Sequence, residues 1–399
     1  MRRQVPPATS LQVLFVLFGI AIAAFFPFFA LFLNGRGLSA GEIGVVIATT
    51  AVARVLCNPV WGHLSDSTLG RRRALQLGTF GSAIAAFALF FTSSLASILV
   101  VAFVFAAMSS TTGPNIDALT LVHLGDDQMH QYGRIRGWES LSYAASCLVF
   151  GFVLQMAGAR WAMPIYGAAA ILVLLWSSTL VPDRPTRSEQ HHGRLGTVGA
   201  AFRAAPRFWL FLLALLFVWI GFNAAWNFIS LKIEAAGGGP FLVGIGTALG
   251  GLVEVPVMRS SSRLVRRYGL RVLYVSGCCV YALGFLLWGL ISNPTIVSLL
   301  TVLEGLGFGL LFTTGVLVIG RMLPSSLYST GQSMAATASF GLGPILGAGI
   351  GGFVFDRFGS VTLYTGASLL ALTGATVAWF ALSPSALSAS EPAPVVAPM

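Results

Sequence analysis

Charged residues are scarce in this chain: Asp, Glu, Lys and Arg make up 9% of its 399 residues, whereas hydrophobic residues make up 56%. A soluble globular domain carries about 25% charged residues, so this composition excludes a soluble enzyme and a disordered chain. The alternating segments of about ten residues that mark a transmembrane β-barrel are also missing, and continuous apolar runs stand in their place. The composition therefore predicts an all-α integral membrane protein.

The residues of common catalytic and metal sites are equally sparse. The four cysteines are neither arranged as CxxC nor paired with a histidine, so neither a disulfide framework nor a metal site is expected. The five histidines all lie between the apolar runs, no Ser or Cys has an evident partner, and no Walker-type phosphate loop occurs. We therefore expect no enzyme, no ATP-driven pump and no cofactor, and we keep a sensor without transport as an alternative.

Apolar runs of about 20 residues, the length of one membrane crossing, occur twelve times. They lie near 11–33, 42–61, 74–92, 96–120, 134–156, 161–181, 208–232, 241–258, 271–291, 294–319, 331–353 and 361–382. The long polar stretch 182–207 predicts a cytoplasmic linker between an N-terminal six-helix bundle (1–181) and a C-terminal one (208–382). Residues 383–399, rich in Ser, Pro and Ala, are predicted to be a disordered cytoplasmic tail.

Lys and Arg are concentrated in the loops on one side of the predicted membrane. When residues at the ends of the spans are counted with the adjoining loop, the N-terminus and the loops after even-numbered spans hold eighteen Lys and Arg residues, and the loops after odd-numbered spans hold four. By the positive-inside rule both termini are cytoplasmic, in the inner (plasma) membrane. Because the charge is sorted by loop instead of gathered on one face, the net charge of +10 does not indicate a nucleic-acid partner.

The two halves repeat. Gly151-Phe152-Val153 matches Gly352-Phe353-Val354 at an offset of 201, and Gly70 with its arginines matches Gly269 with Arg271 at an offset of 199. Two pseudo-symmetric six-helix bundles are typical of transporters whose site lies at the repeat interface near mid-membrane. A fold of this kind is self-sufficient, so a monomer is the expectation.

The segment Gly62-His-Leu-Ser-Asp66-Ser-Thr-Leu-Gly70-Arg-Arg-Arg73 resembles the signature between helices 2 and 3 of the major facilitator superfamily (MFS), with one extra residue between Asp66 and Gly70. Asp66 can pair with arginines at the start of the next helix, and the glycines permit a tight turn. The gate residues expected from this motif are Gly62, Asp66, Gly70, Arg71 and Arg72. A solvated basic loop is the alternative reading.

Other segments resemble narrower branches of that superfamily. Phe25-Phe26-Pro27-Phe28-Phe29, Gly113 to Leu119 and Tyr132 to Trp138 resemble the lactose permease branch. Val253-Glu254-Val255-Pro256 and Arg54 resemble the phenylpropionate permease family. The resemblance implies the MFS fold and proton-coupled import of sugars, nucleosides or aromatic carboxylates.

Ionisable residues within spans are costly, so each one is a candidate functional residue. The resemblance maps Asp117 and Arg136 onto an acid–arginine pair that binds substrate in lactose permease, and it aligns Tyr143 with an aromatic that stacks on the sugar ring. Glu139 lies on the same helix face and replaces the glycine usual in the phenylpropionate type. An internal salt bridge between Asp117 and Arg136 is the alternative to substrate contact.

Glu254 and Glu304 have no basic neighbour within their own predicted helices, and Glu304 replaces a typical histidine. A carboxyl in an apolar cavity can carry a proton, so both are predicted proton-coupling residues. Arg54 is grouped with them because it can neutralise one of the acids. Paired gate or packing residues are the alternative.

Four further residues are candidates for substrate contact. Asn223, Trp226 and Asn227 share one face of the seventh span and can offer amides and an aromatic wall. Phe28 belongs to the aromatic-proline segment of the first span. For Trp226, an interfacial anchor is the alternative.

The predicted function is proton-coupled uptake of a small polar or aromatic solute by alternating access. Its partners are then the solute, the proton and the lipid bilayer. Proton-driven efflux of sugars or drugs by the same fold is the alternative. The fifth span reads Ser140-Leu-Ser-Tyr-Ala-Ala-Ser-Cys147 and lacks the antiporter motif, which weighs against a drug/proton antiporter.

Overall fold

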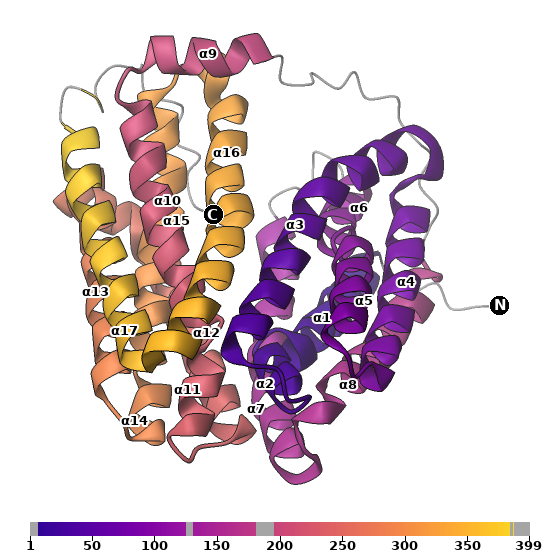
Figure 1. Cartoon of the computed structure of the whole chain (residues 1–399). Helices are drawn as coiled ribbons and strands as arrows, with labels where there is room; N and C mark the ends of the chain where they lie inside the picture. Colours follow the sequence, from indigo (N-terminus) through magenta and orange to yellow (C-terminus); the bar gives the residue numbers. More distant parts are fainter. Residues whose placement is uncertain (1–6, 125–130, 181–194, 384–385, 387–399) are drawn as a thin grey trace. The chain divides into compact units, whose positions relative to one another are not determined.

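The computed structural model describes residues 7–124, 131–180, 195–383 and 386, and all regular elements in these ranges are helical (Figure 1). Most of the predicted tail 383–399 and much of the predicted linker 182–207 lie outside them, although residues 195–204 of that linker form a helix. The α-helices are α1 (Pro7–Phe25), α2 (Phe29–Asn34), α3 (Ala40–Leu64), α4 (Arg71–Phe91), α5 (Leu95–Ser109), α6 (Thr112–Leu124), α7 (Tyr132–Ala157), α8 (Ala162–Ser177), α9 (Leu195–Ala204), α10 (Phe208–Trp226), α11 (Ile229–Ala235), α12 (Pro240–Tyr268), α13 (Leu270–Leu290), α14 (Pro294–Leu299), α15 (Thr301–Met322), α16 (Tyr328–Ala336) and α17 (Gly343–Ala381).

The helices are long and apolar enough for a multi-pass membrane protein. Ten helical segments of the described chain qualify as membrane spans, and Thr9–Phe25 is a shorter apolar helix. One of the ten, Ser325–Ala381, is 57 residues long and contains two helices joined at Gly359, where the backbone is not helical. Since one crossing takes about 20 residues, this segment accounts for two crossings. Together with Thr9–Phe25, the described helices then give the predicted twelve spans.

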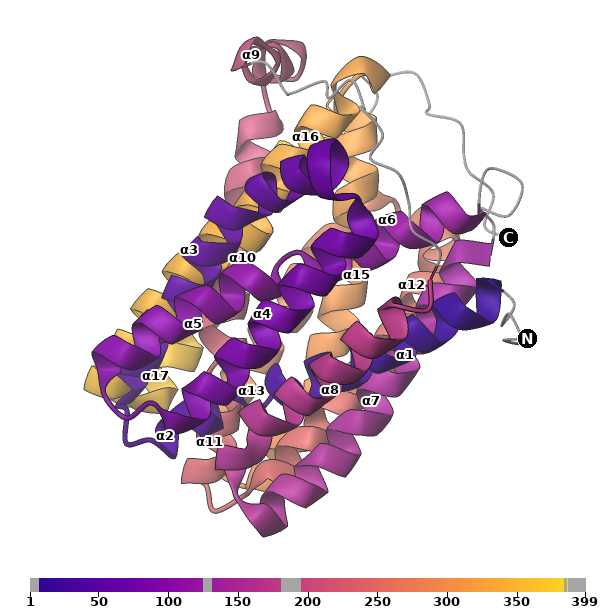
Figure 2. The ribbon, with the colours of Figure 1, turned by 90° about the vertical axis from the view of Figure 1, so that its right-hand side faces the viewer.

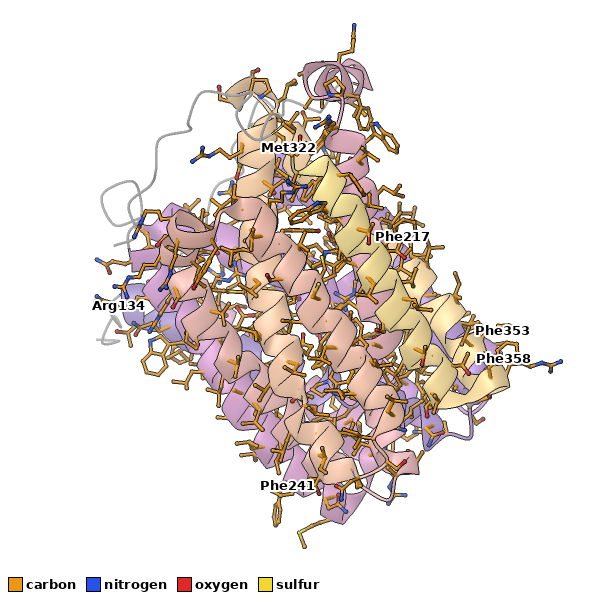
Figure 3. The ribbon with its side chains drawn as sticks, turned by 90° about the vertical axis from the view of Figure 1, so that its left-hand side faces the viewer. Arg134, Phe217, Phe241, Met322, Phe353 and Phe358 are labelled. Atoms are coloured by element: carbon orange, nitrogen blue, oxygen red, sulfur yellow. The ribbon has the colours of Figure 1, made fainter. Side chains whose placement is uncertain are left out.

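Large apolar side chains cover the outside of the helices. Phe353 and Phe358 of α17 are 59% and 61% exposed and project from the ribbon in Figure 3. Phe91 at the end of α4 is 80% exposed. Such exposure is costly in water and favourable in lipid, so these side chains belong in the hydrocarbon region.

Contacts within the chain divide it into two compact units. Unit 1 comprises residues 1–189 and 238–248, and unit 2 comprises residues 190–237 and 249–399. The sequence-based division at 182–207 differs in placing residues 238–248, the first turns of α12, with the C-terminal bundle. The reason is visible at Gly244, which is packed against the Cys147 carbonyl of α7.

In unit 1, α1 packs along α7 and α8, while α4 packs against α5 and α8 (Figure 2). Glycines let these helices approach closely: a Cβ on Gly78 of α4 would lie 2.7 Å from the Met108 carbonyl oxygen of α5. At the loop after α2, Arg36 donates to the Thr92 carbonyl at 3.0 Å and to the Phe90 carbonyl. Partial burial, together with the charge of Arg160, lowers the pKa of Arg36.

In unit 2, α10 packs along α17, and α13 packs against α17 and α15. The contact between α10 and α17 is made through glycines of α17. A Cβ on Gly347 would lie 2.6 Å from the Ile220 carbonyl oxygen, and one on Gly351 would lie 3.1 Å from Ala224 Cα. Small residues at a helix crossing maximise van der Waals contact between backbones in a medium that supplies no hydrophobic force.

The internal repeat extends to the backbone. Six described residues have positive φ, all of them glycines, and they form three pairs: Gly37 with Gly237, Gly70 with Gly269, and Gly158 with Gly359. The offsets are 200, 199 and 201 residues. The same turn chemistry therefore recurs at equivalent points of both halves, because a residue without Cβ adopts positive φ at little steric cost.

Several predicted spans are interrupted. The run 11–33 forms α1 and α2, separated by a turn at 26–28, and 208–232 falls on α10 and α11 with a turn at 227–228. The run 96–120 likewise contains the junction of α5 and α6, and 294–319 that of α14 and α15. Hydropathy detects the apolar length of a span but not a local break in its hydrogen bonds.

Candidate substrate and proton sites

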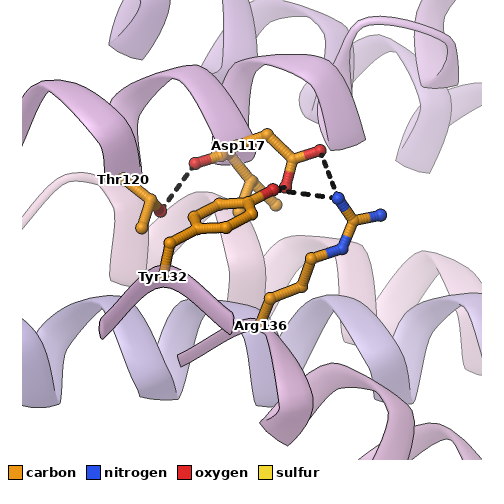
Figure 4. A network of polar contacts seen from close by, with 5 residues as sticks. Asp117, Thr120, Tyr132 and Arg136 are labelled. Carbon is orange, nitrogen blue, oxygen red and sulfur yellow. Dashed lines mark hydrogen bonds and ion pairs between the residues drawn. The ribbon is translucent and has the colours of Figure 1, made fainter. Parts of the chain in front are cut away.

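Three polar side chains of unit 1 form a closed network between the middle of α6 and the first turns of α7 (Figure 4). The Tyr132 hydroxyl donates to Asp117 Oδ1 at 2.8 Å and accepts from Arg136 Nη1 at 2.9 Å. Arg136 Nη1 also lies 3.3 Å from Asp117 Oδ2. The structure thus brings together Asp117 and Arg136, which the resemblance paired.

This network remains open to a ligand. The side chain of Arg136 is 52% exposed and that of Asp117 is 30% exposed. The recorded contacts of Arg136 use Nη1. A guanidinium presents five N–H donors in a planar fork, which suits a carboxylate or a sugar diol.

Two further predicted residues follow on the same face of α7. The half-buried Glu139 lies close enough for its charge to act on Arg136 and on Asp117. The half-buried Tyr143 packs against a small buried cluster that includes Ala23 of α1 and Cys147. The backbone of this stretch touches α1 directly, because a Cβ on Gly19 would collide with the Glu139 carbonyl and the Ser142 hydroxyl.

Phe28 and Arg54 lie elsewhere in unit 1. Phe28 is fully buried in the turn 26–28, directly before α2. Arg54 of α3 donates to the Ser109 hydroxyl at 3.5 Å, and the structure records no ion pair for it among the described residues. Substrate contact by Phe28 and neutralisation of an acid by Arg54 stay predictions.

The motif that resembles the superfamily signature forms a π-helical turn, Ser65–Leu69, followed by Gly70 with φ 77°. Asp66 Oδ1 lies 3.6 Å from Arg71 Nη2. Arg72 instead donates to the carbonyls of Leu180 at 2.6 Å and Ser178 at 2.9 Å, just after α8. One arginine therefore holds the turn and the next ties α4 to the end of α8.

Gly62 of the same motif has open space around it, since a Cβ there would meet no atom within 4 Å. Its expected role in the gate is therefore not explained by packing within the structure.

In unit 2, Glu254 of α12 and Glu304 of α15 lie on facing helices. Gly305 is packed against the Gly250 carbonyl, and a Cβ on Gly250 would lie 3.0 Å from Glu304 Oε2. Glu304 is 5% exposed and close enough to Glu254 for the two charges to repel. Within the described ranges no cation and no hydrogen-bond donor is recorded for Glu304.

Asn223, Trp226 and Asn227 form one half-buried face at the end of α10. The Asn223 amide donates to the Trp219 carbonyl at 2.8 Å, and the Asn227 amide donates to the Asn223 carbonyl at 2.8 Å. Trp226 stacks on Phe222, with ring centroids 6.0 Å apart and planes 11° apart. The amides are thus bonded to their own helix and Trp226 to an aromatic neighbour. Substrate contact by these three residues stays a prediction.

Sequence reasoning missed one member of the unit 1 network. Tyr132 stands four residues before Arg136, a spacing that places both on one helix face. That spacing could have indicated it, since an aromatic hydroxyl can both accept from a guanidinium and donate to a carboxylate.

Twelve membrane spans in two repeated halves, with the buried acid Glu304 on one of them, define the class of secondary transporters. Residues 9–365 match the MFS_1 like family, and the chain belongs to that family. It is a membrane transporter and not an enzyme.

Several known proteins are similar to this chain. A maltose permease of Geobacillus stearothermophilus is 25% identical over 376 residues, covering 92% of this chain and 93% of the permease. A probable 3-phenylpropionic acid transporter of Escherichia coli is 27% identical over 71% of this chain and 74% of its own length. The crystal structure of the nucleoside transporter NupG has the same fold, with a TM-score of 0.80 at 17% identity over 95% of this chain and 98% of that chain.

Proposed function

We propose that this transporter couples the uptake of a small polar or ring-bearing solute to the inward movement of a proton. The main support is that Glu304 is only 5% exposed and has no ion-pair partner among the residues that the structure describes. Burying an isolated charge is expensive, so such a site tolerates the neutral, protonated acid. Reopening the site to water would allow the proton to leave, which is what a coupling residue must do.

Glu254 is the second acid of the proposed proton site. It faces the same helix contact as Glu304, so ionisation of one acid disfavours ionisation of the other. The state in which the pair holds one proton is therefore favoured over the state in which both acids are ionised. Arg54 is proposed as a cation that lowers the cost of ionising one of the acids.

The proposed substrate site uses the Asp117–Tyr132–Arg136 network, with Glu139 and Tyr143 beyond it on α7. Arg136 would bind the carboxylate or hydroxyls of the solute, and Tyr143 would contact its ring. From unit 2, Asn223, Trp226 and Asn227 are proposed contacts, and Phe28 is proposed from the first span. Sugars, nucleosides and aromatic carboxylates are the candidate solutes, consistent with the names of the similar proteins.

The remaining proposals concern the membrane, the orientation of the termini, the oligomeric state and the gate. We place the protein in the inner membrane with both termini in the cytoplasm, because arginines accumulate in the loops on that side. A monomer is proposed, with residues Gly62 to Arg72 acting in the gate.

The test uses the purified full chain in liposomes with an imposed inward proton gradient. Maltose, nucleosides and 3-phenylpropionate are screened for accumulation, and each hit is repeated with Glu304→Gln, Glu254→Gln and Arg136→Ala. We expect Glu304→Gln or Glu254→Gln to abolish accumulation while retaining downhill exchange, and Arg136→Ala to abolish both. Asp356→Asn, which removes an exposed carboxyl of α17, is the matched control.

Unaltered accumulation in both Gln variants would overturn the proton assignment. Solute movement only against an outward proton flow would favour efflux.

A further inference from the structure

Tyr281 of α13 carries a hydroxyl that is buried without a partner. The residue is 1% exposed, and no hydrogen bond to its hydroxyl oxygen is recorded in the described part of the chain. Buried polar groups in native proteins are nearly always hydrogen-bonded, so an unpaired one calls for a physical reason.

Packing holds the Tyr281 ring in place. One edge lies against Gly307 of α15, where a Cβ would collide with the ring. Phe222 of α10 stacks on it with centroids 5.4 Å apart and planes 12° apart, and the Phe285 centroid lies 5.1 Å away. The hydroxyl position is therefore set by three helices, and the unpaired state does not arise from a loosely held side chain.

The acids whose charges act on Tyr281 are the two proposed proton carriers. Glu304 lies one turn before Gly307 on α15, and its charge interacts with Tyr281, as does that of Glu254 on α12. On α13 itself the Cys278 thiol, one turn away, is the remaining titratable group that interacts with it. The face of α10 packed on the ring is aromatic. On α13, Trp288 lies next to Phe285, and Tyr364 of α17 contacts Trp288 and not Tyr281 in the recorded ring contacts.

We propose that Tyr281 is a positioning residue for proton exchange at Glu304, an inference that rests on the proposed function. When Glu304 releases its proton, the Tyr281 hydroxyl keeps its own proton and donates a hydrogen bond to the new carboxylate. When Glu304 is protonated, that bond is released; in the described part of the structure the Tyr281 hydroxyl makes no recorded hydrogen bond. A hydrogen bond to a carboxylate is about twice as strong as one between neutral groups, so the hydroxyl favours the ionised acid.

The consequence is a defined pH range for coupling. Without the donor, the Glu304 carboxylate is less stable, and a higher pH is needed to remove its proton. Tyr281→Phe deletes only the hydroxyl, so we expect the midpoint of proton-driven uptake against pH to move by about one unit towards alkaline pH. Exchange of labelled for unlabelled solute at equal pH on both sides should be unchanged.

Tyr364→Phe is the matched control. Tyr364 of α17 is 0% exposed, its hydroxyl also lacks a recorded partner within the described residues, and neither acid acts on it. We expect this variant to leave the midpoint in place. A shift of equal size in both Phe variants would assign the effect to packing and overturn the inference.

The double variant Tyr281→Phe with Glu304→Gln separates this inference from the proposed function. If Glu304→Gln leaves coupling intact, the proposed function fails. If Glu304→Gln uncouples transport but Tyr281→Phe alone leaves the midpoint unchanged, only the role of Tyr281 fails. The inference is supported if Tyr281→Phe changes proton-driven uptake in the wild-type background but causes no further change when added to Glu304→Gln.

Discussion

Arg136 Nη1 lies 3.3 Å from Asp117 Oδ2, an ion pair that joins α7 to α6. The Tyr132 hydroxyl bonds to both partners, so all three groups share one geometry. An internal bridge and a substrate-binding pair would look alike in this conformation. They differ in what happens when the two charges are exchanged.

We predict that Asp117→Arg combined with Arg136→Asp does not restore transport. The exchange keeps a bridge between α6 and α7 but moves the guanidinium away from the position proposed for substrate. Either single substitution should reduce uptake at least about tenfold, whereas the free energy of unfolding should change by about 1 kcal/mol or less, as for other exposed ion pairs. Uptake in liposomes and thermal melts measure the two effects, and recovery of uptake in the exchanged variant would show a structural bridge.

A second prediction concerns the arginines that open α4. Arg72 bonds the Leu180 and Ser178 carbonyls, whereas Arg73 is exposed with no interaction recorded for it in the described structure. Arg72→Ala should lower the free energy of unfolding by about 1–3 kcal/mol, the range for a hydrogen bond to a charged group. Arg73→Ala is the control, and equal melting temperatures for the two variants would contradict the assigned role of Arg72.

A third prediction concerns the contact of α12 with α15. A methyl group on Gly305 would overlap the Gly250 carbonyl, so Gly305→Ala must push the helices apart. We expect destabilisation by about 1–3 kcal/mol, as for overpacked cores, together with weaker proton-driven accumulation because the Glu304 site opens. Gly251→Ala is the matched change, since no atom lies within 4 Å of its added Cβ. The idea fails if both variants melt and accumulate solute alike.

Some helix breaks follow from sequence and others do not. The first span is interrupted at 26–28, where Pro27 lacks the N–H needed for a helical hydrogen bond. The seventh span is interrupted at the equivalent point 200 residues later, where Asn227 and Phe228 carry no such restriction. The second break is therefore imposed by packing, which a hydropathy pattern does not record.

The candidate site residues also divide into those that the sequence could predict and those that it could not. The pairing of Asp117 with Arg136 could be predicted from the sequence, because the two residues carry opposite charges and lie in segments that resemble the lactose permease branch. Tyr281 could not, because a single tyrosine in an apolar helix has no periodic or charge signal. Its importance depends on which side chains of α10 and α15 surround it.

The sequence by itself determined the membrane setting, the twelve spans and the two-fold repeat, because apolar length and loop charge are read directly along the chain. Only the tertiary structure decided which buried acid faces which, where α12 passes from one unit to the other, and which hydroxyl is left unpaired. These features depend on contacts between residues distant in sequence, such as Gly250 with Gly305 and Tyr281 with Gly307. Close packing of Gly305 against the Gly250 backbone and of Gly307 against the Tyr281 ring sets them, and no local sequence pattern encodes such contacts.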